Sequence, residues 1–235
     1  MHSVRSAHDR KAHDSQMTGS VRNTALSRRG TFLALLTLLC APAIAAAAKP
    51  LRIVALGDSL TAGLGLAESE VFPVKLQTAL RAKGHNIEVI NAGVSGDTAS
   101  GGLARLDWSV PDGTAAVILE LGANDALRGV DPAVTRKALE AMILRLKERR
   151  IPVLLAGMQA PRNLGADYAA AFDRIYPELA EAHDLIFFPF FLEGVATDPN
   201  LNQGDGIHPN AAGVDAVVAR ILPRVEALID RAKKQ

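Results

Sequence analysis

The sequence predicts an α/β fold: a three-layer α/β/α sandwich around a doubly wound sheet of about five parallel strands. Two observations support this prediction. Short apolar segments without polar alternation recur from residue 51 onward, as is typical of parallel strands buried on both faces. Segments with helical spacing lie between them, and short strand-to-helix connections favour right-handed crossovers within one parallel sheet.

The expected strands are rich in Val, Ile, Leu or Phe and are bounded by Gly, Asp or Asn. They are Arg52–Leu56, Ile87–Ala92, Ala116–Leu121, Pro152–Ala156 and Leu185–Phe188. The expected helices have apolar residues at helical spacing. They are Phe72–Lys83, Thr98–Leu106, Ala133–Arg149, Ala166–Ala182 and Ala211–Ala232.

The helix expected over Ala133–Arg149 has clear start signals. Asp131 is a suitable N-cap, and Pro132 occupies the first helical position, where its missing N–H has no cost. Its inner face is predicted to consist of Val134, Ala138, Ala141 and Leu144–Leu146. This helix is expected to pack on the sheet and to carry no chemistry.

Residues 1–48 are expected to be a leader and signal peptide, and residues 49–235 to form a single folded domain. Arg28 and Arg29 precede an apolar run at 32–39, and small residues follow it. Basic, then apolar, then small residues is the order of a secretory signal. The apolar run is shorter than the roughly 20 residues that a spanning helix needs. We therefore expect a periplasmic or secreted protein without a stable membrane anchor.

Charge and cysteine content exclude some classes of function. Residues 49–235 carry 20 Lys and Arg against 23 Asp and Glu, a net charge of −3. A mildly acidic domain is a poor nucleic-acid binder, so no nucleic-acid partner is expected. The only cysteine, Cys40, lies in the leader, so neither disulfides nor thiolate catalysis is expected after processing. We expect a monomer.

Polar groups follow three of the expected strands at the point where each strand ends. The first strand runs into Gly57-Asp58-Ser59-Leu60, the second into Asn91-Ala92-Gly93 and the third into Gly122-Ala123-Asn124-Asp125. Ligands bind beyond the carboxyl ends of the strands in an open parallel sheet. These motifs would therefore bring a hydroxyl, a glycine N–H and a carboxamide to one edge.

A fourth motif, Asp205-Gly206-Ile207-His208-Pro209, follows the last expected strand. Gly206 permits a tight turn and the proline favours an extended His208, so the Asp205 carboxylate could reach His208 Nδ1. That contact would leave Nε2 free to take the proton of Ser59. The Ser59 and Gly93 N–H groups and the Asn124 side-chain amide are candidate donors to the oxyanion of acyl transfer.

The four motifs together resemble the four blocks of the GDSL, or SGNH, hydrolase superfamily, and the resemblance covers essentially all of residues 49–235. It implies a flavodoxin-like SGNH fold with Ser59 as nucleophile, His208 as base and Asp205 as supporting acid. It also implies an oxyanion hole formed by Ser59, Gly93 and Asn124. By the same resemblance, neither a cofactor nor a metal is needed.

Three further segments are similar to the periplasmic acyl-CoA thioesterase, lysophospholipase and arylesterase branch of this superfamily. They are Asn91–Thr98, Leu121–Asp125 and Phe188–Leu192. The similarity implies small-molecule acyl ester or thioester substrates and a shallow acyl groove. Within that branch the preferred acyl length stays open.

Apolar residues near the same sheet edge are candidates for the acyl groove. Met158, Leu164 and Ile207 are the predicted substrate-binding residues, and Leu64, Leu66, Phe190, Phe191 and Leu192 are further candidates. The flexible thioether of Met158 would suit a groove that accepts several chain lengths. Core packing is the alternative role for these side chains.

Three other functions compete with an acyl hydrolase. A metal-dependent phosphoesterase would use oxygen ligands from Asp58, Asn124, Asp125 and Asp205 together with His208. A carbohydrate O-deacetylase would use the same triad on acetylated sugars. A non-catalytic exported module that binds acyl chains or glycans would keep the fold without the activity.

Overall fold

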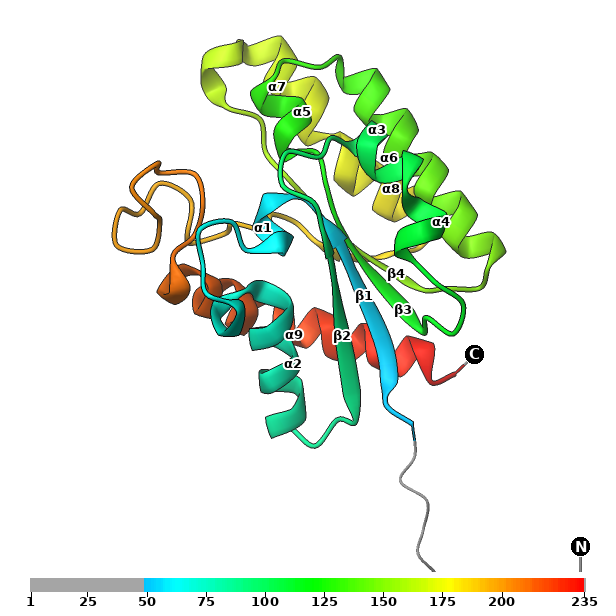
Figure 1. Ribbon diagram of the computed structural model, residues 1–235. Helices are drawn as coiled ribbons and strands as arrows, with labels where there is room; N and C mark the ends of the chain where they lie inside the picture. Colours follow the sequence, from blue (N-terminus) through cyan, green and yellow to red (C-terminus); the bar gives the residue numbers. More distant parts are fainter. Residues whose placement is uncertain (1–48, 235) are drawn as a thin grey trace, which may run out of the picture. The chain divides into compact units, whose positions relative to one another are not determined.

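A parallel sheet of five strands forms the centre of the structure, a computed structural model that describes residues 49–234 (Figure 1). Neighbouring strands are parallel throughout, in the order β2-β1-β3-β4-β5. The strands are β1 (Leu51–Gly57), β2 (Ile87–Gly93), β3 (Ala116–Glu120), β4 (Val153–Ala156) and β5 (Ile186–Phe188).

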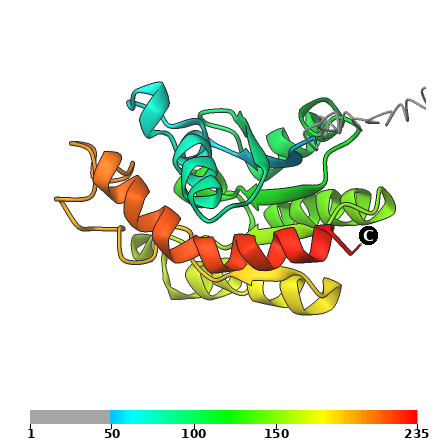
Figure 2. The ribbon, with the colours of Figure 1, turned by 90° about the horizontal axis from the view of Figure 1, so that it is seen from below.

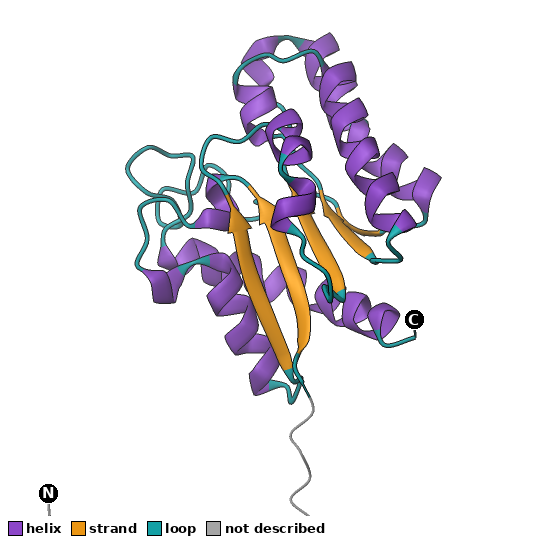
Figure 3. Cartoon of the chain, turned by 45° about the vertical axis from the view of Figure 1, so that its right-hand side comes forward, coloured by secondary structure: helices purple, strands orange, loops and turns teal. Residues whose placement is uncertain are grey.

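Helices cover both faces of the sheet (Figures 1 and 3). On one face α2 (Phe72–Ala82) packs against α9 (Ala211–Ala232), which Figure 2 shows in orange to red. On the other face lie α3 (Ala99–Ala104), α6 (Pro132–Glu148) and α8 (Ile175–His183). The remaining helices are α1 (Ser59–Ala62), α4 (Leu106–Ser109), α5 (Ala123–Leu127), α7 (Ala166–Asp173) and the 3-10 turns η1 (Glu68–Glu70) and η2 (Arg162–Leu164). The predicted three-layer sandwich is confirmed.

All five predicted strands are present, and each observed end lies within one residue of its predicted end. Every residue of β3 and of β4 is buried, as are the last five residues of β1. Burial on both faces is the reason that these strands show continuous apolar runs without alternation. The pattern of hydrophobicity was therefore sufficient to locate them.

Two of the predicted helices are each divided into two in the structure. The segment predicted as one helix over Thr98–Leu106 is divided at Arg105 into α3 and α4, and Ala166–Ala182 is divided at Arg174 into α7 and α8. The single-turn helices α1 and α5 were not predicted, because a segment of four or five residues shows no helical period.

The inner face of α6 is also shifted from its predicted position. Val134 and Leu144 are nearly half exposed, whereas the prediction placed them against the sheet. The buried positions are Thr135, Ala138, Leu139, Met142, Ile143 and Leu146. Thr135 takes a buried position because its hydroxyl donates to Asp125 Oδ1 at 2.9 Å, a polar contact that hydrophobic periodicity does not show.

The order of the strands determines where the site lies. From β1 the chain passes first to β2 on one side and then to β3 on the other. Such a reversal separates the loops that follow the two neighbouring strands and opens a crevice at their carboxyl ends. The motifs after β1, β2 and β3 therefore converge on one end of the sheet.

The predicted leader and signal peptide, residues 1–48, lie outside the described residues. Within residues 49–234, no helix has both the length and the apolar character needed to cross a bilayer. Export therefore stays a prediction from the sequence.

Candidate active site

The turn that carries Ser59 is held by the residue before it. Asp58 is the N-cap of α1, and its Oδ1 accepts a hydrogen bond from the Leu60 N–H at 3.0 Å. Because Ser59 is the first residue of the helix, its own N–H has no acceptor within α1. Only glycine fits at position 57, where a Cβ would lie 2.1 Å from Thr61 Oγ1. The turn therefore presents the Ser59 hydroxyl and N–H at the sheet edge.

His208 and Asp205 reach Ser59 from a single loop. His208 Nε2 lies 2.9 Å from Ser59 Oγ, and His208 Nδ1 lies 2.6 Å from Asp205 Oδ2. The other carboxylate oxygen, Oδ1, accepts from the N–H groups of Ile207 at 2.9 Å and His208 at 3.0 Å. These hydrogen bonds lower the pKa of Asp205 to about 2, and the bond from the His208 N–H has the largest effect. Asp205 is therefore ionised at any pH near neutrality and holds the ring through its Nδ1.

Two further acids lie beneath the turn that carries Ser59. Burial raises the pKa of Asp58 to about 6, although hydrogen bonds from Leu60 and Asn124 oppose this rise. Burial also raises the pKa of Glu120 well above its usual range, and the nearby Asp58 adds to the effect. Glu120 Oε2 accepts from Thr61 Oγ1 at 2.6 Å, whereas Oε1 has no hydrogen-bond partner in the described residues. Sequence reasoning did not identify Glu120, which occupies the last position of a buried strand.

Asn124 joins the same network from α5. Its Nδ2 donates to Asp58 Oδ2 at 3.1 Å, and the amide nitrogen carries a second hydrogen for another acceptor. The preceding Gly122 has φ of 116°, a left-handed conformation that favours glycine. A Cβ there would also lie 2.1 Å from the Tyr176 hydroxyl. The entry into α5 therefore depends on glycine, and it places Asn124 next to the nucleophile turn.

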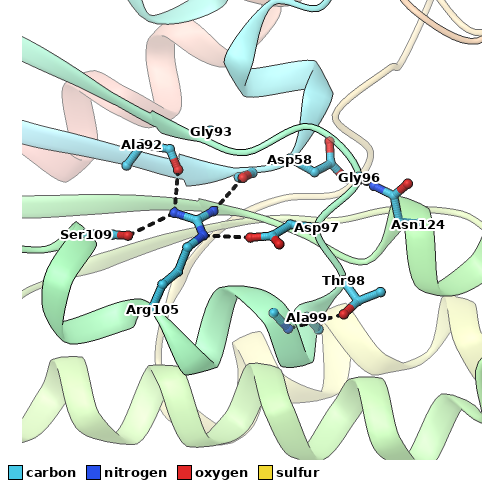
Figure 4. A network of polar contacts seen from close by, with 12 residues as sticks. Asp58, Ala92, Gly93, Gly96, Asp97, Thr98, Ala99, Arg105, Ser109 and Asn124 are labelled. Carbon is cyan, nitrogen blue, oxygen red and sulfur yellow. Dashed lines mark hydrogen bonds and ion pairs between the residues drawn. The ribbon is translucent and has the colours of Figure 1, made fainter.

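Gly93, the glycine expected in the oxyanion hole, lies at the end of β2. The Gly93 N–H donates to Asn91 Oδ1 at 3.0 Å, so it is already used at the end of β2. In the view of Figure 4, Gly93 lies at the end of β2, and Gly96 lies in the turn that follows, between Asp58 and Asn124. The Gly96 carbonyl also accepts from Arg128, the C-cap of α5, at 2.9 Å.

The two glycines of this motif differ in their geometry. Gly93 is required on steric grounds, since a Cβ would lie 2.2 Å from the Ala62 nitrogen. Gly96 has φ of 84°, and the part of the chain that the structure describes offers no acceptor for its N–H. Two glycines three residues apart look alike in a sequence, and only the backbone geometry separates their roles.

Asp125, one of the residues considered above as a metal ligand, has structural partners. Asp125 is buried, and its carboxylate accepts from the Ala99 N–H at 2.8 Å and from Thr135 Oγ1 at 2.9 Å. It thus ties the start of α3 to α6. Over residues 49–234 no group of three or more His, Cys, Asp or Glu side chains is arranged to hold a metal ion. Asp125 is structural in this arrangement.

An apolar cavity of about 530 Å³ opens beside Ser59 and His208. Met158 and Ile207 line it as predicted, and so do Phe190 and Leu192. Leu164 is not among the lining residues, although Arg162 of the same 3-10 turn, η2, is. A second hollow, of about 610 Å³, lies near the start of β4, and its lining contains no serine, threonine or cysteine.

The remaining apolar candidates have other positions. Phe191 is buried and packs edge-on against Phe72, with ring centroids 5.0 Å apart. Leu64 and Leu66 line a small recess on the far side of Ser59 and His208. Adjacent phenylalanines thus have different roles, one in the core and one in the cavity wall.

Similarity to known proteins agrees with this geometry. An α/β sandwich with these motifs at its strand ends is that of an SGNH-type carboxylic ester hydrolase. The chain belongs to the GDSL-like Lipase/Acylhydrolase family, whose sequence profile matches residues 55–216.

Relatives with assigned names include esterases and a thioesterase. Esterase TesA of Pseudomonas aeruginosa is 40% identical over 185 residues, which cover 78% of this chain and 91% of that protein. Thioesterase 1/protease 1/lysophospholipase L1 of Escherichia coli K12 is 41% identical over 180 residues, covering 76% and 82%. Among solved structures, the SGNH-hydrolase family esterase AlinE4 is 48% identical with a TM-score of 0.66, covering 77% of this chain and 98% of that one.

Proposed function

We propose that the protein hydrolyses acyl esters and thioesters through an acyl-enzyme on Ser59. His208 Nε2, 2.9 Å from Ser59 Oγ, takes the hydroxyl proton as Oγ attacks the acyl carbon. The proton then passes to the leaving alcohol or thiol. In the second half-reaction His208 takes a proton from water, the hydroxide releases the acid, and the proton returns to Ser59. The observation that carries the proposal is the continuous Ser59–His208–Asp205 hydrogen-bonded chain.

Asp205 acts through the ring of His208. Its carboxylate, 2.6 Å from Nδ1, selects the tautomer with the proton on Nδ1 and stabilises the imidazolium formed during attack. Since its pKa is lowered to about 2, the carboxylate keeps its charge throughout the reaction.

Three donors are proposed for the oxyanion: the Ser59 N–H, the second Asn124 Nδ2 hydrogen and the Gly96 N–H. The first two come from the sequence prediction, and Gly96 replaces Gly93 for the geometric reasons given above. Donors already fixed by the fold need no rearrangement when the negative charge develops. Asn124 is fixed by its contact with Asp58, and Ser59 by the N-cap of α1.

The apolar cavity beside Ser59 is proposed to hold the acyl chain. Its lining by Met158, Phe190, Leu192 and Ile207 favours an aliphatic or aromatic group over a sugar. The names of the relatives, which include esterase, arylesterase, thioesterase and lysophospholipase, support the same substrate class. We also propose that the protein acts outside the cytoplasm, on the basis of the signal predicted in residues 1–48.

The proposal is tested with p-nitrophenyl esters from acetate to palmitate and a parallel acyl-CoA series. The wild type should hydrolyse esters with an optimum at medium chains, Ser59→Ala should lose all turnover, and the exposed Ser100→Ala in α3 should retain it. A fluorophosphonate probe should label the wild type and not Ser59→Ala. Phosphonate chemistry is apt, because an esterase of Pseudoalteromonas that is 29% identical, with a TM-score of 0.72, has been solved inhibited by monoethylphosphonate.

Each alternative has its own outcome in this experiment. Activity confined to acetate would favour a carbohydrate O-deacetylase. A folded wild type that neither turns over esters nor reacts with the probe would favour a non-catalytic acyl- or glycan-binding module. Equal turnover in the wild type and Ser59→Ala would refute the assignment of the nucleophile.

A further inference from the structure

The proposed donor Gly96 belongs to a tight turn over residues 94–97. The Asp97 N–H donates to the Val94 carbonyl at 3.1 Å, and Gly96 has a positive φ while Ser95 does not. These features define a type II turn with glycine at its third position. The central N–H of such a turn is not used in closing it, so the Gly96 N–H is left to face the site.

The side chain of Arg105 joins this turn to β1, the strand that precedes Ser59 (Figure 4). Arg105 Nη2 donates to the Gly57 carbonyl at 2.8 Å and Nη1 to the Ala92 carbonyl at 2.9 Å. Its Nε donates to Asp97 Oδ2 at 2.6 Å. A fourth bond, from Nη1 to Ser109 Oγ at 2.9 Å, fixes the guanidinium from the side of α4.

Three of the four acceptors of Arg105 lie next to the groups proposed to act in the reaction. The Gly57 carbonyl ends β1, two residues before Ser59, and it also accepts from the Val94 N–H at 3.0 Å. The Ala92 carbonyl belongs to the second-last residue of β2, just before the chain enters the turn. Asp97 closes the turn that contains Gly96. Arg105 thus holds both ends of the turn and the strand of the nucleophile in one arrangement.

The burial and shape of the guanidinium favour a specific role. The Arg105 side chain is only 15% exposed, and Asp97 is 19% exposed. A planar guanidinium presents its N–H donors in a fixed fork, whereas an ammonium is a compact point charge that does not reproduce that fork. The ion pair Arg52–Glu88 joins the same two strands at their opposite end, yet it is a single contact and about 40% exposed.

We propose that Arg105, with Asp97, is a positioning residue for catalysis: it holds the 94–97 turn so that the Gly96 N–H aligns with the oxyanion formed at Ser59. The inference rests on the proposed function. A substrate carbonyl in the ground state needs this alignment less than the oxyanion does. Loss of the arginine should therefore slow the chemical step without weakening substrate binding.

The test compares Arg105→Lys and Asp97→Asn with Arg52→Lys as the matched control, on a short p-nitrophenyl ester. Removal of one oxyanion donor costs about 10²–10³ in turnover, and a displacement of about 1 Å can cost about 10². We expect Arg105→Lys to lower kcat and kcat/KM by the same factor, about 10- to 100-fold, with KM within about twofold. Asp97→Asn should show a smaller fall of the same kind, and Arg52→Lys none.

Two readouts separate positioning from a general loss of structure. An alkylboronic acid forms a tetrahedral adduct on a serine hydroxyl, and its inhibition constant should rise by the factor by which kcat/KM falls. The pH profile of kcat/KM should keep its wild-type shape, because the Ser59–His208–Asp205 contacts are untouched. In Arg105→Ala, added guanidinium chloride at millimolar concentration should restore part of the activity. Far-UV circular dichroism confirms that each variant is folded.

The outcomes distinguish this inference from the proposed function. An active wild type whose Arg105→Lys variant has kcat within twofold, or binds the boronic acid as tightly as the wild type, would overturn the inference alone. A rise in KM with unchanged kcat would also overturn it. If Arg105→Lys does not fold, Asp97→Asn decides by the same criteria. A wild type without ester turnover would overturn the proposed function and this inference together.

Discussion

Replacement of Asp58 by asparagine should change how the stability of the protein depends on pH. Asp58 is fully buried, and burial raises the pKa of its carboxyl from 3.8 to about 6. Asparagine keeps an oxygen to accept from the Leu60 N–H, the contact that caps α1. The substitution therefore removes the titrating group and retains the acceptor that orders the nucleophile turn.

The direction of this pH dependence follows from the number of protons that the folded and unfolded states bind. Between pH 3.8 and about 6 the folded state keeps the Asp58 proton while the unfolded state releases it, so the free energy of unfolding falls as pH rises. The pKa difference corresponds to about 3 kcal/mol at 1.36 kcal/mol per pKa unit. Relative to the wild type, Asp58→Asn should gain about 3 kcal/mol in free energy of unfolding between pH 3.5 and pH 7.

Urea unfolding at several pH values, followed by far-UV circular dichroism, measures this difference. The single tryptophan, Trp108, is 83% exposed, so its fluorescence is a poor reporter of unfolding. The same substitution in a Glu120→Gln background controls for the neighbouring acid. A difference between Asp58→Asn and wild type that is the same at pH 4 and pH 7, within about 0.5 kcal/mol, would refute the reasoning.

Three other predictions concern the groups around Ser59. Glu120→Gln should stabilise the protein increasingly as pH rises above 4.5, because burial raises the pKa of Glu120 and the charged carboxylate is costly in the core. If the difference in unfolding free energy between Glu120→Gln and the wild type is the same at pH 5 and pH 8, this prediction is wrong. Asn124→Ala should lower kcat about 10²- to 10³-fold, the usual cost of one oxyanion donor; steady-state kinetics showing a fall below fivefold would exclude it from that role. Met158→Ala should change the ratio of short-chain to long-chain ester turnover, because Met158 lines the cavity; an unchanged ratio would assign it to the core alone.

The sequence was a good guide to elements that are buried along their whole length. β3 and β4 are continuous apolar runs because both faces of the sheet are covered, and α9 spans the predicted range Ala211–Ala232. Short elements were missed, since α1 is defined by the N-cap Asp58 and by Gly63 in a left-handed conformation at its end. The phase of α6 was misjudged because the buried Thr135 is polar.

Within the site, short-range and long-range features differed in how far they could be predicted. Asp205 and His208 are three residues apart with a glycine between them, which lets the two side chains approach each other. The structure has that contact. The contacts of Arg105 span 48 residues to Gly57 and 13 to Ala92. No local pattern marks such an arginine, because its partners are main-chain carbonyls that every residue possesses.

The loop that carries His208 has a mechanical consequence. The carboxylate of Asp205 accepts the ring hydrogen bond and two main-chain hydrogen bonds of the same loop, so the proposed base and its proposed orienting group form one preassembled unit. Ser59 belongs to a different segment and meets that unit through a single contact. A shift of the loop relative to Ser59 would therefore lengthen the Oγ–Nε2 contact and leave the contact between His208 and Asp205 intact. The orientation of the imidazole ring is thus set within the loop and does not depend on the position of Ser59.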